Sequence, residues 1–130
     1  PLMRGVRDER GEATTELVLV TPVLLLLIAF VLQFALWYHA SHVAEAAAQE
    51  GARTARVFGG SAEAGRETAE HFLAETGPKV VVDPEVTATR NAGTARVDVR
   101  GHAVTLVPGL RLGITASAES PTERFSPVTP

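Results

Sequence analysis

The sequence contains no cysteine, which excludes disulfide bonds, thiolate zinc sites and cysteine nucleophiles. It also lacks an excess of basic residues: 12 Lys and Arg stand against 15 Asp and Glu, so no strongly basic surface indicates nucleic-acid binding. Phosphate-cradling glycine loops, nucleophile elbows and zinc-protease helix motifs are all missing. We therefore expect these 130 residues to form one modest domain that is not an enzyme and uses no cofactor.

Charge is also absent from a long stretch near the N-terminus, from Leu17 to Tyr38. As an α-helix these roughly 22 residues would be about 33 Å long, enough to cross a hydrocarbon core of about 30 Å. Trp37 and Tyr38 close the stretch, where amphipathic rings favour the headgroup region. The sequence therefore predicts a transmembrane helix over residues 17–38.

Basic residues are distributed unevenly around this stretch. Arg4, Arg7 and Arg10 precede it, and no Lys or Arg follows it until Arg53. Because positively charged flanks stay in the cytoplasm, the N-terminus is predicted to be cytoplasmic and the C-terminal domain extracytoplasmic. The expected protein is thus a single-pass protein of the cell membrane, with a cytoplasmic leader over residues 1–16.

The apolar stretch has two other interpretations. A buried helix of a soluble protein is disfavoured because a chain of 130 residues cannot cover so long and uniformly apolar a helix. A cleaved secretory signal peptide would have an apolar region of only about 7–15 residues. Small residues over 43–46 still offer cleavage-like spacing, so this alternative stays open.

The residues that lead into the apolar stretch carry a recognisable pattern. Gly11 is followed five residues later by Glu16, and Pro22 comes six residues after that glutamate. The glycine, the glutamate and the long apolar helix resemble the processing site of type IV prepilins. The proline and the leucine-rich run behind it resemble the TadE-like proteins of tight-adherence pilus systems, and residues 46–53 (AAAQEGAR) are similar to the alanine-rich stretch that follows the membrane helix in that family. Gln33 departs from the pattern, because many relatives carry an acidic residue late in the helix.

This resemblance implies that residues at the membrane boundary act in assembly. A prepilin peptidase would cut after Gly11, so that Glu12 supplies a new N-terminal amine, and the carboxylate of Glu16 would pair with that amine on a neighbouring subunit. A carboxylate near hydrocarbon costs roughly 2.5–3.5 kcal/mol at a helix centre and less near an end, and the helix dipole partly offsets this cost. An ordinary acidic residue at a helix start is the alternative interpretation. Pro22, whose missing N–H membrane helices tolerate, is grouped with Glu16 as an assembly residue.

The resemblance as a whole implies a membrane-anchored minor pilin or pseudopilin-like component of a tight-adherence (type IV-like) pilus or a related secretion system, with a part in cell adhesion. Its partners would be membrane lipid, other pilin or pseudopilin subunits, the pilus assembly machinery and a prepilin peptidase. The alternative is a single-pass anchor that holds a small binding domain outside the cell. A metal-dependent enzyme built on His39, His42 and Glu45 is a more remote alternative, since their spacing by threes also suits polar residues just outside the membrane.

Residues 39–119 are predicted to form an exported α+β domain. Its first part continues the membrane helix to about Phe58, the following two glycines end that helix, and Ser61 is a good N-cap for a second helix over residues 62–76. A stripe of small residues on the first helix would pack against partner subunits or, as we slightly prefer, against the protein's own sheet. The stripe consists of Ala40, Ala44, Ala47, Gly51, Ala55 and Phe58.

Three further segments predict the strands of the domain. Valine-rich or alternating patterns over 79–90, 94–107 and 110–119 favour a three-stranded antiparallel meander with the long helix packed on its apolar face. The phase of the second pattern slips near Gly101, which suggests a bulge in that strand. The polar, proline-broken tail over 120–130 is predicted to be disordered.

Overall fold

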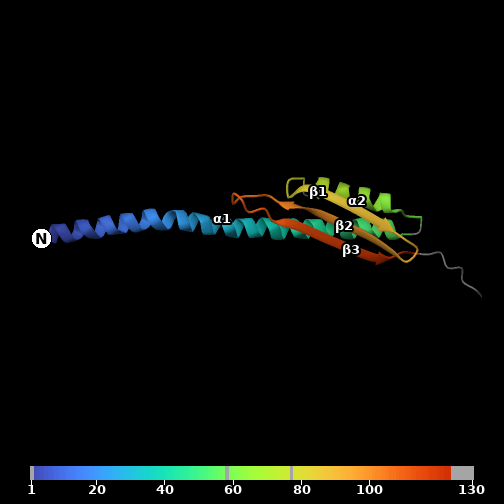
Figure 1. Cartoon of the computed structure of the whole chain (residues 1–130), viewed down its shortest axis with the longest axis horizontal. Coiled ribbons are helices and arrows are strands. Elements are labelled where there is room, and N and C mark those ends of the chain that lie inside the picture. Colours follow the sequence, from blue (N-terminus) through green and yellow to red (C-terminus); the bar gives the residue numbers. More distant parts are fainter. Residues whose placement is uncertain (1, 58, 77, 124–130) are drawn as a thin grey trace, which may run out of the picture.

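The computed structural model describes residues 2–57, 59–76 and 78–123, with side chains described from Gly11 onward. In chain order the elements are helices α1 (Leu2–Arg56) and α2 (Ala62–Thr76) and strands β1 (Val81–Arg90), β2 (Thr94–Ala103) and β3 (Gly113–Pro121). Figure 1 shows the N-terminal half of α1 projecting from the domain, while its C-terminal half lies beside α2 and the sheet. The predicted α+β fold, with a long N-terminal helix, a short second helix and a three-stranded antiparallel sheet, is confirmed.

The sheet is an antiparallel meander in the order β1-β2-β3. Along the central strand β2, Ala95, Val97 and Val99 are buried, whereas Arg96 and Arg100 between them are exposed, as period-two alternation requires. The two helices pack against each other, and of the strands α1 contacts mainly β2 and β3 and α2 mainly β1, so both helices cover the apolar face of the sheet. The hydrophobic core lies between this face and the two helices.

The bulge that the sequence predicted in β2 lies instead in β1. Strand β2 stays regular through Gly101, whereas the pairing of β1 shifts between Val82 and Glu85, opposite that glycine. Asp83 within the bulge has a φ of 49°, a left-handed conformation that aspartate adopts more readily than most residues. A Cβ on Gly101 would lie 2.7 Å from Cγ1 of Val81. The glycine therefore leaves space for a bulge in the neighbouring strand, which explains the apparent phase slip.

The stripe of small residues on α1 faces the protein's own domain. Within the described part of the stripe, Ala40, Ala44, Ala47, Gly51 and Ala55 are all buried, and Phe58 lies outside the described residues. At Gly51 the two helices approach so closely that a Cβ would lie 2.7 Å from the carbonyl oxygen of Gly65 in α2. The stripe therefore packs within the chain, against α2 as well as against the sheet that the preferred interpretation named.

Hydrogen bonds fix the start of α2 and the chain that follows β3. The hydroxyl of Ser61 accepts a hydrogen bond of 3.0 Å from the N–H of Ala64, so the predicted N-cap is confirmed. β3 runs to Pro121, and the backbone N–H groups of Thr122 and Glu123 then donate to the β1–β2 turn and to the end of α1. The prediction of a disordered tail is therefore wrong for residues 120–123, because residues 120 and 121 pair with β2 and these hydrogen bonds anchor residues 122 and 123. Residues 124–130 lie outside the described residues.

Candidate assembly surface on the N-terminal helix

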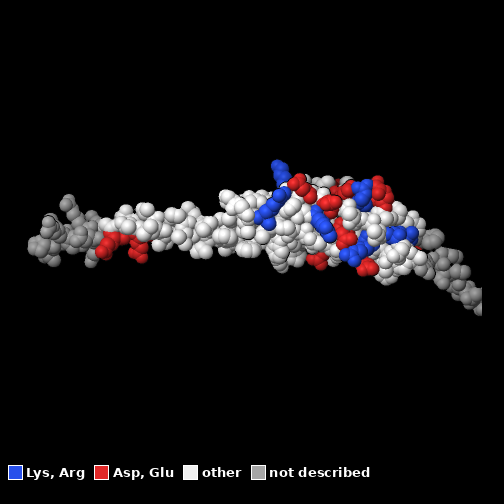
Figure 2. All heavy atoms as spheres, viewed as in Figure 1, with Lys and Arg blue, Asp and Glu red and all other residues white. Residues whose placement is uncertain are grey.

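The N-terminal half of α1 makes no contact with the rest of the described domain over most of its length. Every residue from Gly11 to Ile28 is exposed, and the leucine, valine and isoleucine side chains from Leu17 to Leu32 keep 48–69% of their surface accessible. Figure 2 shows an uncharged surface here, between acidic side chains near the N-terminal end and the charged domain. Soluble monomers rarely expose a continuous apolar surface of this extent. α1 is long and apolar enough to be a candidate membrane span, which is compatible with a single-pass membrane anchor.

Two acidic side chains, Glu12 and Glu16, lie at the base of this apolar surface, and both are exposed. Residues four apart share one face of a helix, so the structure places the predicted processing residue and the predicted pairing residue side by side. Among the side chains described from Gly11 to Glu123, no lysine or arginine forms an ion pair with either carboxylate. Both carboxylates are thus available to a cation from outside the described part of the chain.

Gly11, the predicted processing residue before Glu12, lies inside the continuous helix α1. A Cβ at this position would meet no atom within 4 Å, so packing does not require a glycine here. The carbonyl oxygen of Gly11 accepts a hydrogen bond of 2.8 Å from the hydroxyl of Thr15. Because the bond between Gly11 and Glu12 is helical, a peptidase would need to unwind this part of α1 locally.

Pro22 lies within the apolar surface without ending the helix. Proline has no N–H, so the carbonyl of Val18 loses its usual helical partner. One residue earlier, the hydroxyl of Thr21 donates a hydrogen bond of 2.6 Å to the carbonyl of Leu17, which satisfies this polar group within the helix. Together with Leu25, these four residues line a shallow apolar depression. The depression gives an apolar side chain of another helix a place to pack.

The β2–β3 loop, residues 104–112, lies against α1 at the domain end of this surface. Gln33 is fully buried beneath the loop. Its Nε2 donates a hydrogen bond of 2.8 Å to the carbonyl of Val104, and its Oε1 accepts hydrogen bonds of 2.6 and 3.2 Å from the N–H groups of Leu106 and Val107. In the sequence, Gln33 stands out only as a departure from the family pattern. An amide side chain within an apolar run needs polar partners, and this requirement is the feature of the sequence that predicts a contact for Gln33.

His39, His42 and Glu45, the residues of the remote metal-site alternative, do not form a ligand group among the described side chains. His39, His42 and Glu45 are exposed on α1, and the ring of His42 packs edge-on against Tyr38 with ring centroids 4.4 Å apart. Within the described side chains, no group of three or more His, Asp or Glu is arranged to hold a metal ion. The geometry favours the interpretation of these residues as polar residues beside the apolar run.

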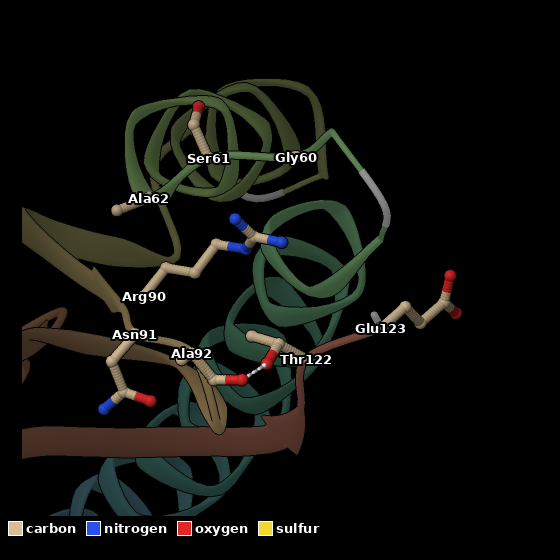
Figure 3. A pocket seen from close by; sticks show the side chains of 8 residues that line it. All are labelled: Gly60, Ser61, Ala62, Arg90, Asn91, Ala92, Thr122 and Glu123. Atoms are coloured by element: carbon tan, nitrogen blue, oxygen red, sulfur yellow. Dashed lines mark hydrogen bonds between the residues drawn. The ribbon is translucent and has the colours of Figure 1, made fainter. Parts of the chain in front are cut away.

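A polar hollow lies at the end of the domain farthest from the N-terminus (Figures 1 and 3). Its lining consists of Gly60, Ser61, Ala62, Arg90, Asn91, Ala92, Thr122 and Glu123. The guanidinium of Arg90 donates a hydrogen bond of 3.4 Å to the carbonyl of Val57, and the hydroxyl of Thr122 donates one of 2.7 Å to the carbonyl of Ala92, drawn as a dashed line in Figure 3. The hollow is shallow, and Arg90 is the cation that it offers to a ligand.

The shifted pKa values lie in the domain, away from the apolar surface of α1. On the outer face of the sheet, hydrogen bonds from Arg96 and from the hydroxyl of Ser117 hold the pKa of the Asp98 carboxyl below its ordinary value. On α2, a hydrogen bond from Arg66 likewise lowers the pKa of the Glu63 carboxyl. These groups therefore affect the stability of the domain, and they do not contribute to the candidate assembly surface.

Comparison with known proteins bears on the first part of the chain. The sequence model of the TadE-like protein family matches residues 11–53, a segment that includes Gly11, Glu12, Glu16 and Pro22. The predicted resemblance is confirmed over this segment, and the match indicates a protein associated with a tight-adherence (Tad) pilus system. No curated protein and no solved structure matches the chain at a significant level.

Proposed function

Since residues 11–53 form a TadE-like segment, we propose that this protein is a membrane-anchored minor pilin or pseudopilin-like component of a tight-adherence (type IV-like) pilus or a related secretion system. It is an assembly component and not an enzyme, and it acts by lateral packing of its N-terminal helix. The observation that carries this proposal is the exposed apolar surface of α1 with Glu16 at its base. Such a surface is stable in the cell when lipid or other apolar helices cover it.

The proposed orientation places residues 1–16 in the cytoplasm, residues 17–38 in the membrane and the domain outside. A prepilin peptidase cuts between Gly11 and Glu12. The new amine of one subunit then pairs with the Glu16 carboxylate of its neighbour. An adjacent cation favours the charged form of a carboxylate and reduces the cost of holding it near hydrocarbon. The charge pair would fix the axial register of neighbouring helices, while the depression at Pro22 receives an apolar side chain.

Replacement of Glu16 by leucine tests the assembly role directly. We expect Glu16→Leu to remain in the membrane fraction but to lose chemical cross-links to neighbouring subunits in membranes of the native host. Glu45→Leu is the matched control, because Glu45 is an exposed glutamate on the same helix beyond the apolar run. A cross-linking pattern for Glu16→Leu that equals the wild-type pattern would show that Glu16 has no recognition role.

The intact mass of the protein isolated from its native membrane separates the remaining alternatives. A new N-terminus at Glu12 supports the pilin-like role. A cut near Ala46 would indicate a secreted protein with a signal peptide. An uncut chain would fit a plain membrane anchor or a family member that escapes processing.

The second candidate function is a single-pass anchor for a small binding domain outside the cell. The observation in its favour is the polar hollow of Figure 3, into which Arg90 extends. A binding role for the hollow predicts that Arg90→Gln abolishes ligand capture by the domain while Glu16→Leu leaves it unchanged. The assembly role predicts that Glu16→Leu loses its cross-links to neighbouring subunits, whereas Arg90→Gln keeps them.

A further inference from the structure

We propose that the β2–β3 loop dips into the headgroup region of the leaflet on the domain's side and forms a second membrane contact beside α1. The inference rests on the membrane anchorage proposed above. It adds a surface that lies outside the residues matched by the family, and it assigns phospholipid as the occupant of that surface. Three features of the loop carry it: its level along α1, its backbone bonding and its side chains.

The contacts with α1 fix the level of the loop. Gln33, which the loop buries, lies five residues before Tyr38 in the sequence, or about 7.5 Å back along the helix from the end of the predicted span. At the base of the loop, the indole Nε1 of Trp37 donates a hydrogen bond of 3.0 Å to the carbonyl of Gly113. Tryptophan favours the headgroup region of a bilayer. When the apolar part of α1 spans a membrane, the loop is therefore held at the level of the bilayer surface or below it.

The backbone of the loop suits this position. Irregular backbone at membrane depth is tolerated where the protein itself satisfies its polar groups. The Gln33 side chain pairs with the carbonyl of Val104 and with the N–H groups of Leu106 and Val107. The turn at the tip is closed by a hydrogen bond of 3.1 Å from the N–H of Leu110 to the carbonyl of Val107. The loop can therefore approach lipid without leaving these groups unpaired.

The outward side chains of the loop form an apolar surface with one positive charge. Leu106 is 45% exposed, Pro108 is exposed and Leu110 is partly exposed, whereas Leu112 packs against the core. Arg111 is exposed, and it is the only charged residue of the loop. An arginine can lay its apolar stem along lipid tails and direct its guanidinium to lipid phosphate groups. Because this surface continues the exposed apolar surface of α1, we assign it to lipid and not to a second protein.

Site-directed spin labelling tests the contact on the full-length protein in vesicles of phosphatidylethanolamine and phosphatidylglycerol. The chain has no cysteine, so each label needs only one new cysteine. The test position is Leu106→Cys, the water control is the exposed strand position Thr87→Cys, and the hydrocarbon control is Leu25→Cys. We expect the ratio of oxygen to nickel-chelate accessibility at residue 106 to be several-fold higher than at residue 87 and lower than at residue 25.

The controls separate the failure of this inference from the failure of the membrane anchor. If the label at residue 106 is as accessible to the nickel chelate as the label at residue 87, while residue 25 stays in hydrocarbon, the loop contact is overturned and the anchor stands. If residue 25 is also open to the nickel chelate, the anchor itself is overturned. Protection of residue 106 from both reagents would mean that a protein neighbour covers the loop, which overturns the assignment to lipid.

The unlabelled protein provides a second measurement, because Trp37 is its single tryptophan. Lipids with bromine near the carbonyl end of the acyl chain are expected to quench Trp37 several-fold more strongly than lipids with bromine near the methyl end. Trp37 fluorescence that neither lipid quenches would place the base of the loop outside the bilayer and overturn the inference.

Discussion

The side-chain oxygen of Gln33 accepts a hydrogen bond of 2.6 Å from the backbone N–H of Leu106, 73 residues later in the sequence. The amide nitrogen of the same side chain donates to the carbonyl of Val104, so one residue of the apolar helix holds the first half of the β2–β3 loop. This relationship links the candidate membrane-spanning helix to the domain. With α1 across a bilayer, as proposed above, the level of the domain would be determined within the chain, before any partner binds.

Replacement of Gln33 by leucine is expected to release the β2–β3 loop. The N–H of Leu106 and the carbonyl of Val104 would lose their partner, and a buried polar group left unpaired costs about 1–3 kcal/mol. We expect the free energy of unfolding in detergent to fall by a similar amount, and the Leu106 amide to exchange faster in hydrogen-exchange mass spectrometry. Gln49→Leu, at an exposed position of the same helix, should change stability by less than about 0.5 kcal/mol. Unchanged exchange at Leu106 would contradict the role of Gln33.

Local periodicity made much of the fold predictable from the sequence. The alternation of Ala95, Val97 and Val99 identified the buried face of β2, and the N-cap at Ser61 located the start of α2. The position of the bulge was not predictable, since a bulge is a property of strand pairing and a single strand does not show its register. Gly101 marked the place but not the strand that bulges.

The candidate site was predictable only where it is local. Gly11, Glu16 and Pro22 follow one another along a single helix, and the structure places them on the exposed part of α1 as a continuous segment. The pairing of Gln33 with the β2–β3 loop could not be inferred from the sequence, because it depends on how the sheet docks on the helix. Spacing along the chain carries no information about such a contact.

Replacement of Gly65 by alanine is expected to destabilise the domain. A Cβ here would lie 2.7 Å from the carbonyl oxygen of Gly51 and 2.8 Å from Cβ of Ala55, so α1 and α2 would have to move apart. Overpacking of this kind costs about 1–3 kcal/mol, which outweighs the gain of up to about 1 kcal/mol from the better helix propensity of alanine. Chemical denaturation should show the loss. Gly113→Ala is the control, because its Cβ would meet no atom within 4 Å; an equal effect of both substitutions would argue against close helix packing as the cause.

The Asp98 carboxyl is expected to make the stability of the domain fall in acid. Arg96 and Ser117 lower its pKa in the folded state. A group whose pKa is lower in the folded than in the unfolded state stabilises the fold above its unfolded pKa of about 4, and this contribution is lost as the pH falls through the folded pKa. Asp98→Asn should therefore be less stable than the wild type at neutral pH, and its stability should decline less below about pH 4.

Thermal unfolding of both proteins across this pH range measures the difference. Glu67→Gln serves as the control, since Glu67 is an exposed carboxylate that forms no ion pair among the described side chains. Parallel stability curves for Asp98→Asn and the wild type would contradict the assignment of acid sensitivity to Asp98.

Replacement of Gly11 by alanine distinguishes two roles of the glycine at the proposed processing site. No atom lies within 4 Å of the new Cβ, so we expect membrane insertion and the stability of the domain to stay unchanged. Cleavage after residue 11 should slow by about ten-fold or more if the peptidase pocket has no space for a methyl group. Pulse-chase labelling followed by intact-mass analysis of the membrane fraction measures this rate, and processing of Gly11→Ala at the wild-type rate would contradict recognition of the glycine.

A slower cut could also arise because alanine makes α1 harder to unwind, by about 1 kcal/mol relative to glycine. The double variant Gly11→Ala/Ala13→Gly returns one glycine to the same helical turn and so restores the ease of unwinding. If the peptidase recognises the residue before the cleaved bond, the double variant is cleaved as slowly as Gly11→Ala. Recovery of the wild-type rate would instead mean that the glycine acts by loosening the helix, because the cleavage site must leave the helical conformation before it can enter the peptidase.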